Sequence, residues 1–163
     1  NSGIVAQDAQ HKFFRLGVSA TAVSDGHVQV MSATMLREGD VAVIVSNSGR
    51  SRDLLDVCDI AKKKGATVIA ITASGSPLAL AVRGAHILLA ADHPEDADRY
   101  SPMVSRLLHL MIIDILTTGV ALRLGSASLR PLLQEIKRNL RQRRYAALAG
   151  VADDDETISS PTP

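Results

Sequence analysis

Short apolar runs alternate with helix-type patterns along most of this chain. Uninterrupted apolar runs of the kind found in buried strands predict strands at residues 21–23, 40–45, 67–72 and 85–90. Between and around these runs, apolar residues recur at three- and four-residue spacing, which predicts helices. The predicted helices cover residues 4–16, 27–36, 52–64, 102–124 and 129–144, with a short additional helix starting at Ser76-Pro77. Strands joined by helices imply an α/β fold: a doubly wound, flavodoxin-like parallel sheet covered by helices on both faces.

The two ends of the chain depart from this pattern. Asn1-Ser2-Gly3 leads directly into a helix, whereas a doubly wound domain normally starts with a strand, so we expect the first strand to be missing from this chain. Residues 146–163 contain the acidic run 153–156 followed by Ser-Ser-Pro-Thr-Pro, a composition that predicts a mobile end. The expected organisation is therefore one folded domain over residues 1–145 and an acidic, Ser/Pro-rich tail over residues 146–163.

The turn between the strand at 40–45 and the helix at 52–64 holds a cluster of small polar residues. Its sequence is Ser46-Asn47-Ser48-Gly49-Arg50-Ser51. Gly49 permits a tight turn and a close approach of the backbone to a ligand. The unpaired N–H groups and positive dipole end of the following helix suit an anion, and Arg50 adds a planar cation that can bind phosphate or carboxylate.

The position of this turn favours ligand binding over a simpler role. A serine-rich N-cap for the helix at 52–64 would explain the hydroxyls equally well in isolation. In parallel sheets, however, ligands bind beyond the carboxyl ends of the strands, and the Ser46 turn occupies such an end. The placement therefore predicts a phosphate-binding turn.

Composition and charge narrow the class of protein. The 163 residues are enough for one domain, and with 46% hydrophobic but only 2% aromatic residues the core must be aliphatic. A net charge of +1 argues against a surface built to bind nucleic acid. Because Cys58 is the single cysteine, the chain has no intrachain disulfide, which fits the reducing conditions of the cytoplasm. We interpret Cys58 as a buried small apolar residue.

The helix predicted at 102–124 carries the longest apolar stretch. It is interrupted by His109, Asp114 and two threonines, which indicates a buried or interface helix and not a membrane span. Its apolar residues exceed what one buried face needs, so we expect a homodimer whose interface includes Ile113 and Leu116.

Two sequence features together resemble a known family. The pattern Ser46-x-Ser48-Gly49-x-Ser51 after a strand, with Asn1-Ser2-Gly3 as the remnant of a second serine-bearing turn, resembles SIS (sugar isomerase) domains, which bind phosphosugars. The run from Gln7 to Gly17 is similar to the effector domain of RpiR-type transcription regulators, especially those of hexose catabolism. The likeness covers about residues 1–145.

This resemblance implies a site, a ligand and a role. The implied phosphate cradle consists of polar residues from two turns: Ser46, Asn47, Ser48 and Ser51, with Asn1 and Ser2 facing them. The implied effector is a phosphorylated sugar or sugar acid, with 2-keto-3-deoxy-6-phosphogluconate favoured and Arg50 as the candidate partner of its second anionic group. RpiR-type regulators contact DNA through an N-terminal helix-turn-helix that this chain does not include, so the chain alone is expected to sense and not to bind DNA.

Chemistry at this site is not expected. Isomerases of the SIS family often carry Glu directly after the glycine of the serine turn, where this chain has Arg50, although a phosphosugar isomerase remains the alternative function. The carboxylates near the expected pocket are Asp8 and Asp53, and the helix N-terminus accounts for Asp53. The five histidines show no i, i+4 pair and no neighbouring cysteine, so we expect neither a metal nor another cofactor.

The last predicted helix ends in a basic run. Its members are Lys137, Arg138, Arg141, Arg143 and Arg144. A solvated helix face with favourable charge at the helix C-terminus explains the run more simply than contact with DNA.

Overall fold

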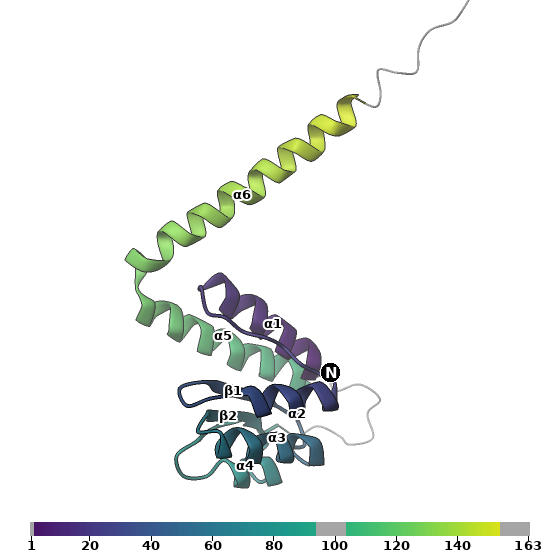
Figure 1. Ribbon diagram of the computed structural model, residues 1–163, viewed down its shortest axis with the longest axis vertical. Coiled ribbons are helices and arrows are strands. Elements are labelled where there is room, and N and C mark those ends of the chain that lie inside the picture. Colours follow the sequence, from purple (N-terminus) through teal and green to yellow (C-terminus); the bar gives the residue numbers. More distant parts are fainter. Residues whose placement is uncertain (1, 94–103, 154–163) are drawn as a thin grey trace, which may run out of the picture.

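The computed structural model of the protein describes residues 2–93 and 104–153, with side chains described as far as Gln142. Within this range, three strands form one parallel sheet with helices against both of its faces (Figure 1). In chain order the elements are α1 (Ser2–Arg15), α2 (Gly26–Met35), β1 (Val41–Val45), α3 (Arg52–Lys63), β2 (Thr67–Thr72), α4 (Pro77–Ala81), β3 (Ile87–Ala90), α5 (Val104–Leu124) and α6 (Ser126–Asp153).

The sheet has the order β1-β2-β3 and both neighbouring pairs are parallel. Val43 pairs with Ile69, and Ile69 pairs in turn with Ile87. Parallel strands need crossover connections, which α3 provides between β1 and β2 and α4 provides between β2 and β3. All strands therefore end at the same edge of the sheet. The predicted doubly wound α/β fold is confirmed.

Each face of the sheet has its own apolar core, because successive strand residues point to opposite faces. On one side Ala70 packs with Cys58 of α3, Leu78 of α4 and Ala33 of α2. On the other side Ile71 packs with residues of α1 and α5, among them Ile113, which has no exposed surface. Aliphatic side chains fill both cores, as the composition predicts.

Three expectations about the elements are wrong. Residues 21–23 form no strand, because side chains occupy their backbone groups: the Ala22 N–H donates to Gln10 Oε1 at 2.6 Å, and Gln29 Nε2 donates to the Val23 carbonyl at 3.1 Å.

The second difference concerns the start of β3. This strand begins at Ile87 and not at residue 85, and the Val68 N–H donates to His86 Nδ1 at 3.1 Å.

The third difference concerns the end of the chain. α6 continues to Asp153, so residues 146–153, expected to belong to a mobile tail, are helical. Residues 154–163 lie outside the described range.

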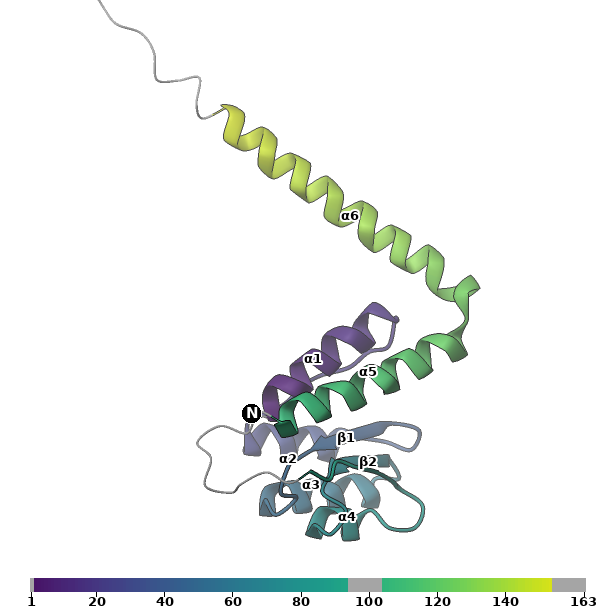
Figure 2. The same cartoon turned by 180° about the vertical axis from the view of Figure 1, so that it is seen from behind.

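α5 lies along α1 and covers one face of the sheet (Figures 1 and 2). By length and composition alone, Val104–Leu124 is also long and apolar enough to cross a membrane. Its buried residues, however, recur at four-residue intervals on one face: Ser105, His109, Ile113 and Thr117. The ion pair of Lys12 with Asp114 holds α1 to α5, and Lys12 also pairs within α1 with Asp8 at 2.6 Å.

α6 leaves the compact part of the molecule. In both views it extends as a single helix away from the sheet and from α1 (Figures 1 and 2). Its first turns remain attached: Leu129 is buried, and Leu132 lies close to Gly17 at the end of α1.

Candidate functional site

Several helix N-termini gather at the edge where the strands end. Gly3 of α1 lies against Ser24, just before α2, and Gly26 at the start of α2 lies against the carboxylate of Asp53 in the first turn of α3. The start of α3 follows the end of β1 after the six-residue turn 46–51. The positive ends of α1, α2 and α3 therefore face one region, which favours a bound anion there.

The Ser46 turn begins inside the protein. The Ser46 N–H donates to the Ile71 carbonyl at 3.0 Å, which prolongs the pairing of β1 with β2 by one residue. Ser46 is buried, and its Oγ accepts a hydrogen bond from the Gly49 N–H at 3.1 Å. The buried Ser46 hydroxyl therefore stabilises the conformation of the turn.

Gly49 joins this turn to the loop between β2 and α4. Its φ of 59° lies in the left-handed region, and a Cβ at this position would lie 2.6 Å from both Ser76 Cβ and Thr72 Oγ1. The Gly49 carbonyl accepts from the Leu78 N–H at 3.1 Å. The backbone of one loop thus contacts side chains of the other at Gly49, and only glycine leaves enough room for this contact.

The β2–α4 loop is itself held by hydrogen bonds. Ser76 Oγ caps α4 by accepting from the Ala79 N–H at 3.1 Å, and it lies 3.1 Å from Thr72 Oγ1. The Ser74 N–H donates to Asp92 Oδ1 at 2.8 Å, and this bond holds the pKa of the Asp92 carboxyl below its usual value. The loop is therefore fixed in place before any ligand arrives.

Ser51 occupies the N-cap of α3 in an extended conformation but makes no side-chain capping bond. An N-cap serine normally accepts from a backbone N–H of the first turn. Here the exposed hydroxyl remains available together with the first-turn N–H groups of a twelve-residue helix. This combination suits a phosphate, which accepts hydrogen bonds from both.

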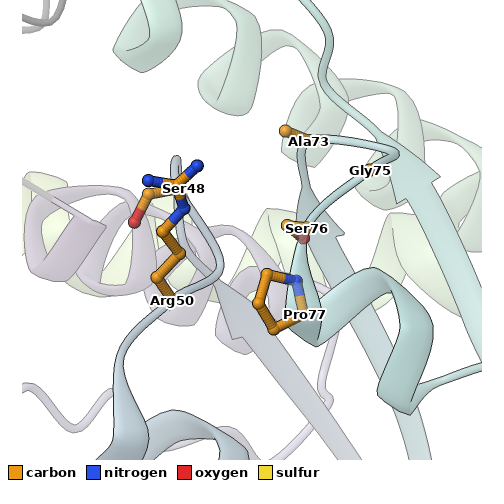
Figure 3. Close-up of a pocket in the computed structure, with 6 residues that line it drawn as sticks. All are labelled: Ser48, Arg50, Ala73, Gly75, Ser76 and Pro77. Atoms are coloured by element: carbon orange, nitrogen blue, oxygen red, sulfur yellow. The ribbon is translucent and has the colours of Figure 1, made fainter.

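A cavity of about 360 Å³ opens between the two loops (Figure 3). Ser48 and Arg50 line it from the β1–α3 side, and the β2–α4 loop contributes Ala73, Gly75, Ser76 and Pro77. Arg50 is exposed and its side chain extends beside Ser48. The cavity offers a cation, two hydroxyls and a small-residue wall, a combination suited to a small anionic ligand.

Most of the predicted site residues lie in one turn, but some of them are exposed and others are buried. Ser48 and Arg50 line the cavity, Ser51 begins α3, and Ser46 and Gly49 are buried behind them. Asn47 is half-buried in the same turn, and Ser2 is the first residue of α1. Asn1 lies outside the described residues.

The cavity residues of the β2–α4 loop were not predicted. Their signal in the sequence is Ser76-Pro77, which by itself indicates only the start of a helix. The carboxyl ends of parallel strands lie at the same edge of a sheet, so the residues that follow the strand at 67–72 lie beside the Ser46 turn. Applying that rule to the second strand would have found them.

The titratable residues outside this site have structural roles where the structure describes them. Asp8 and Asp114 both pair with Lys12, and these hydrogen bonds raise the pKa of the Lys12 ammonium. Cys58 is fully buried, as predicted, and burial raises the pKa of its thiol. Among the described residues, no group of three or more His, Cys, Asp or Glu could hold a metal ion.

Comparison with known proteins identifies the family. The profile of the SIS domain family matches residues 1–119, most of the chain. The chain belongs to the SIS domain family. This SIS domain is 44% identical over 144 residues to the HTH-type transcriptional regulator HexR of Pseudomonas aeruginosa, covering 88% of this chain and 49% of the regulator. It is 50% identical over 128 residues to the bifunctional protein glk of Burkholderia orbicola, covering 78% of this chain and 20% of that protein.

The domain is also similar to solved structures of regulators. It matches the Vibrio vulnificus NanR protein complexed with ManNAc-6P with a TM-score of 0.73 and 25% identity, over 85% of this chain and 52% of NanR. It matches the sugar isomerase domain of the RpiR transcription factor from Sphaerobacter thermophilus with a TM-score of 0.69 and 25% identity, over 83% of this chain and 73% of that one. The predicted resemblance to SIS domains of RpiR-type regulators is confirmed. The chain spans about half the length of HexR and a fifth of glk.

Proposed function

We propose that this domain binds a phosphorylated sugar or sugar acid as the effector of a cytoplasmic transcription regulator, and that it does so without chemistry. The observation that carries the proposal is the start of α3. There the N-cap residue Ser51, whose hydroxyl makes no capping bond, and the free first-turn N–H groups directly follow Arg50, which lines the cavity. A phosphate bound there replaces the missing capping bond of Ser51.

The relatives support the ligand class and the role. NanR is described in complex with ManNAc-6P, a sugar phosphate, and HexR is a transcriptional regulator. DNA binding is assigned to an N-terminal helix-turn-helix outside this chain. The residues of this chain supply the sensing step only.

The proposal is tested by removing the exposed hydroxyls of Ser48, which lines the cavity, and of Ser51, the N-cap of α3. Ser51→Ala and Ser48→Ala should each weaken binding of a sugar phosphate by about 1–3 kcal/mol, because each deletes a hydrogen bond to a charged group. Calorimetric titration measures the affinity. Ser32→Ala, on the exposed surface of α2, is the matched control and should bind normally.

Two results would contradict the site. Unchanged affinity in both Ser48→Ala and Ser51→Ala would mean that the phosphate binds elsewhere. An equal loss in the Ser32→Ala control would mean that the effect is not local. Ser46→Ala is a less informative variant, because Ser46 Oγ also holds the Gly49 N–H and its loss changes the turn itself.

Arg50 is proposed to select ligands with a second anionic group, with 2-keto-3-deoxy-6-phosphogluconate as the favoured effector. A cation in the turn before a helix N-terminus opposes the dipole, so an anionic partner offsets that cost. Arg50→Ala should therefore weaken binding of 2-keto-3-deoxy-6-phosphogluconate more than binding of fructose 6-phosphate. Equal effects on both ligands, measured by the same titration, would assign Arg50 to the common phosphate or to the surface.

The same ligands separate a sensor from the alternative, a phosphosugar isomerase. A sensor shows a thermal shift with the sugar phosphate and no conversion of it. Measurable turnover by the unmodified protein would overturn the sensor proposal. Arg50→Glu places the acid that isomerases often carry, and we expect it to weaken anion binding through like-charge repulsion without creating turnover.

A further inference from the structure

The cavity has two walls of different chemistry (Figure 3). The β1–α3 side presents the hydroxyl of Ser48 and the guanidinium of Arg50, both of them exposed. The opposite side comes from the loop between β2 and α4, and three of its four residues have no polar atom in the side chain. We call this side the β2–α4 wall, and it consists of Ala73, Gly75, Ser76 and Pro77.

The one hydroxyl of the β2–α4 wall is already engaged within the protein. Ser76 is buried, and its Oγ accepts from the Ala79 N–H and lies 3.1 Å from Thr72 Oγ1. The Ser76 N–H donates to the Ala73 carbonyl at 3.0 Å. The side chains of the wall therefore offer a ligand carbon surface, chiefly the methyl group of Ala73 and the ring of Pro77.

Gly75 contributes free volume that the fold does not require. Its backbone is not in the left-handed region that Gly49 occupies, and a Cβ at Gly75 would meet no atom within 4 Å. Other residues would therefore fit the loop without strain, unlike at Gly49. The missing side chain of Gly75 instead keeps space open beside Ala73, where a ligand can lie.

The two walls impose an orientation on a ligand with two anionic groups. The proposed phosphate contacts, Ser48 and the start of α3, and the proposed partner of the second anionic group, Arg50, all belong to the β1–α3 side. The Ala73 side chain points across the cavity towards that side (Figure 3). The carbon chain that joins the two anionic groups therefore has its other side against the β2–α4 wall.

We propose, building on the proposed function, that the β2–α4 wall selects a phosphorylated sugar acid with a methylene in this carbon chain, and that Ala73 and Gly75 determine that specificity. A hydroxyl placed against these residues loses its hydrogen bonds to water and finds no side-chain partner. A methylene has no such bonds to lose. Apolar pockets discriminate against one added hydroxyl by up to about 100-fold, so the expected preference for the deoxy acid is about 10–100-fold.

The test compares two acids with the same chain length and the same two anionic groups. 2-Keto-3-deoxy-6-phosphogluconate has a methylene at its third carbon, where 6-phosphogluconate has a hydroxyl. Calorimetric titration of the unmodified chain should give about 10–100-fold tighter binding of the deoxy acid.

Ala73→Ser adds a hydroxyl to the wall and should reduce this affinity ratio by about 10-fold, because the hydroxyl of 6-phosphogluconate then has a partner. Ala85→Ser is the matched control and should keep the original ratio. Ala85 is exposed before the start of β3, at the edge of the sheet opposite the cavity.

Gly75→Val tests the free volume separately. The added side chain occupies the space beside Ala73, so both acids should bind at least about 10-fold more weakly. Inorganic phosphate does not need that space and should bind Gly75→Val and the unmodified chain equally. Circular dichroism establishes that each variant is folded, as the open surroundings of Gly75 predict.

The outcomes separate this selectivity from the proposed function. An unmodified chain that binds neither acid overturns the proposed function, and the selectivity with it. Binding of both acids with equal affinity, or an affinity ratio that Ala73→Ser leaves unchanged, overturns the selectivity while sugar-acid binding stands. Undiminished binding of both acids by Gly75→Val would mean that the ligand does not lie against the β2–α4 wall.

Discussion

At the scale of single residues, Gly49 decides the shape of the candidate site. Its backbone is left-handed, its carbonyl binds the start of α4, and its missing side chain leaves room for Ser76 and Thr72. The sequence motif indicated that a glycine is needed for a tight turn. It could not show that the glycine is also the point at which the two cavity loops touch.

Gly49→Ala separates these two requirements when compared with Gly39→Ala. Both glycines have positive φ, 59° and 90°, but a Cβ at Gly39 meets no atom within 4 Å. Gly39→Ala should therefore lower the free energy of unfolding by about 1–2 kcal/mol, the strain of a left-handed alanine. Gly49→Ala carries the same strain plus a collision with Ser76 and Thr72, so we expect a larger loss in urea unfolding and lost binding of sugar phosphate. Equal stability losses in the two variants would show that the loops are not in tight contact.

At the scale of elements, α5 shows what a hydrophobic pattern can and cannot specify. The pattern correctly predicted a long helix with more apolar residues than one face needs. It did not show which residues face inward. The expectation that Ile113 lies in a dimer interface is wrong, whereas for the half-buried Leu116 it stays a prediction. Ile113 is fully buried in the chain's own core, and Leu116 packs against that core. A helix that is apolar all round has no polar side to indicate its orientation.

Substitutions two residues apart test this orientation. Ile113→Ala should lower the free energy of unfolding by about 2–5 kcal/mol, because it leaves a cavity between α5 and the sheet. Ile115→Ala removes an exposed side chain and should change the stability of the folded chain by less than about 1 kcal/mol. We expect Ile115→Ala to weaken the association of two copies of the chain instead. Urea unfolding at several protein concentrations distinguishes an effect on folding from an effect on association. A larger loss of unfolding free energy for Ile115→Ala than for Ile113→Ala would mean that the opposite face of α5 packs on the sheet.

At the scale of the whole molecule, the candidate site and α6 lie at opposite ends of α5. The ends of the strands and the N-termini of α1, α2 and α3 gather near the start of α5, whereas α6 departs from its far end (Figure 1). β2 was predicted residue by residue, because a short apolar run between a glycine and a polar turn permits little else. The strand predicted at 21–23 does not exist, because the side chains of Gln10 and Gln29 bind the backbone there, and no local pattern indicates such bonds.

Cys58 offers a chemical reporter that requires no engineering. It is the only thiol in the chain, it has no exposed surface, and its raised pKa keeps little of it as the reactive thiolate. A maleimide or disulfide reagent can therefore reach it only when α3 separates from the sheet. The rate of labelling then measures how often that core opens, and a ligand that bridges the start of α3 to the β2–α4 loop should slow the labelling in proportion to its binding.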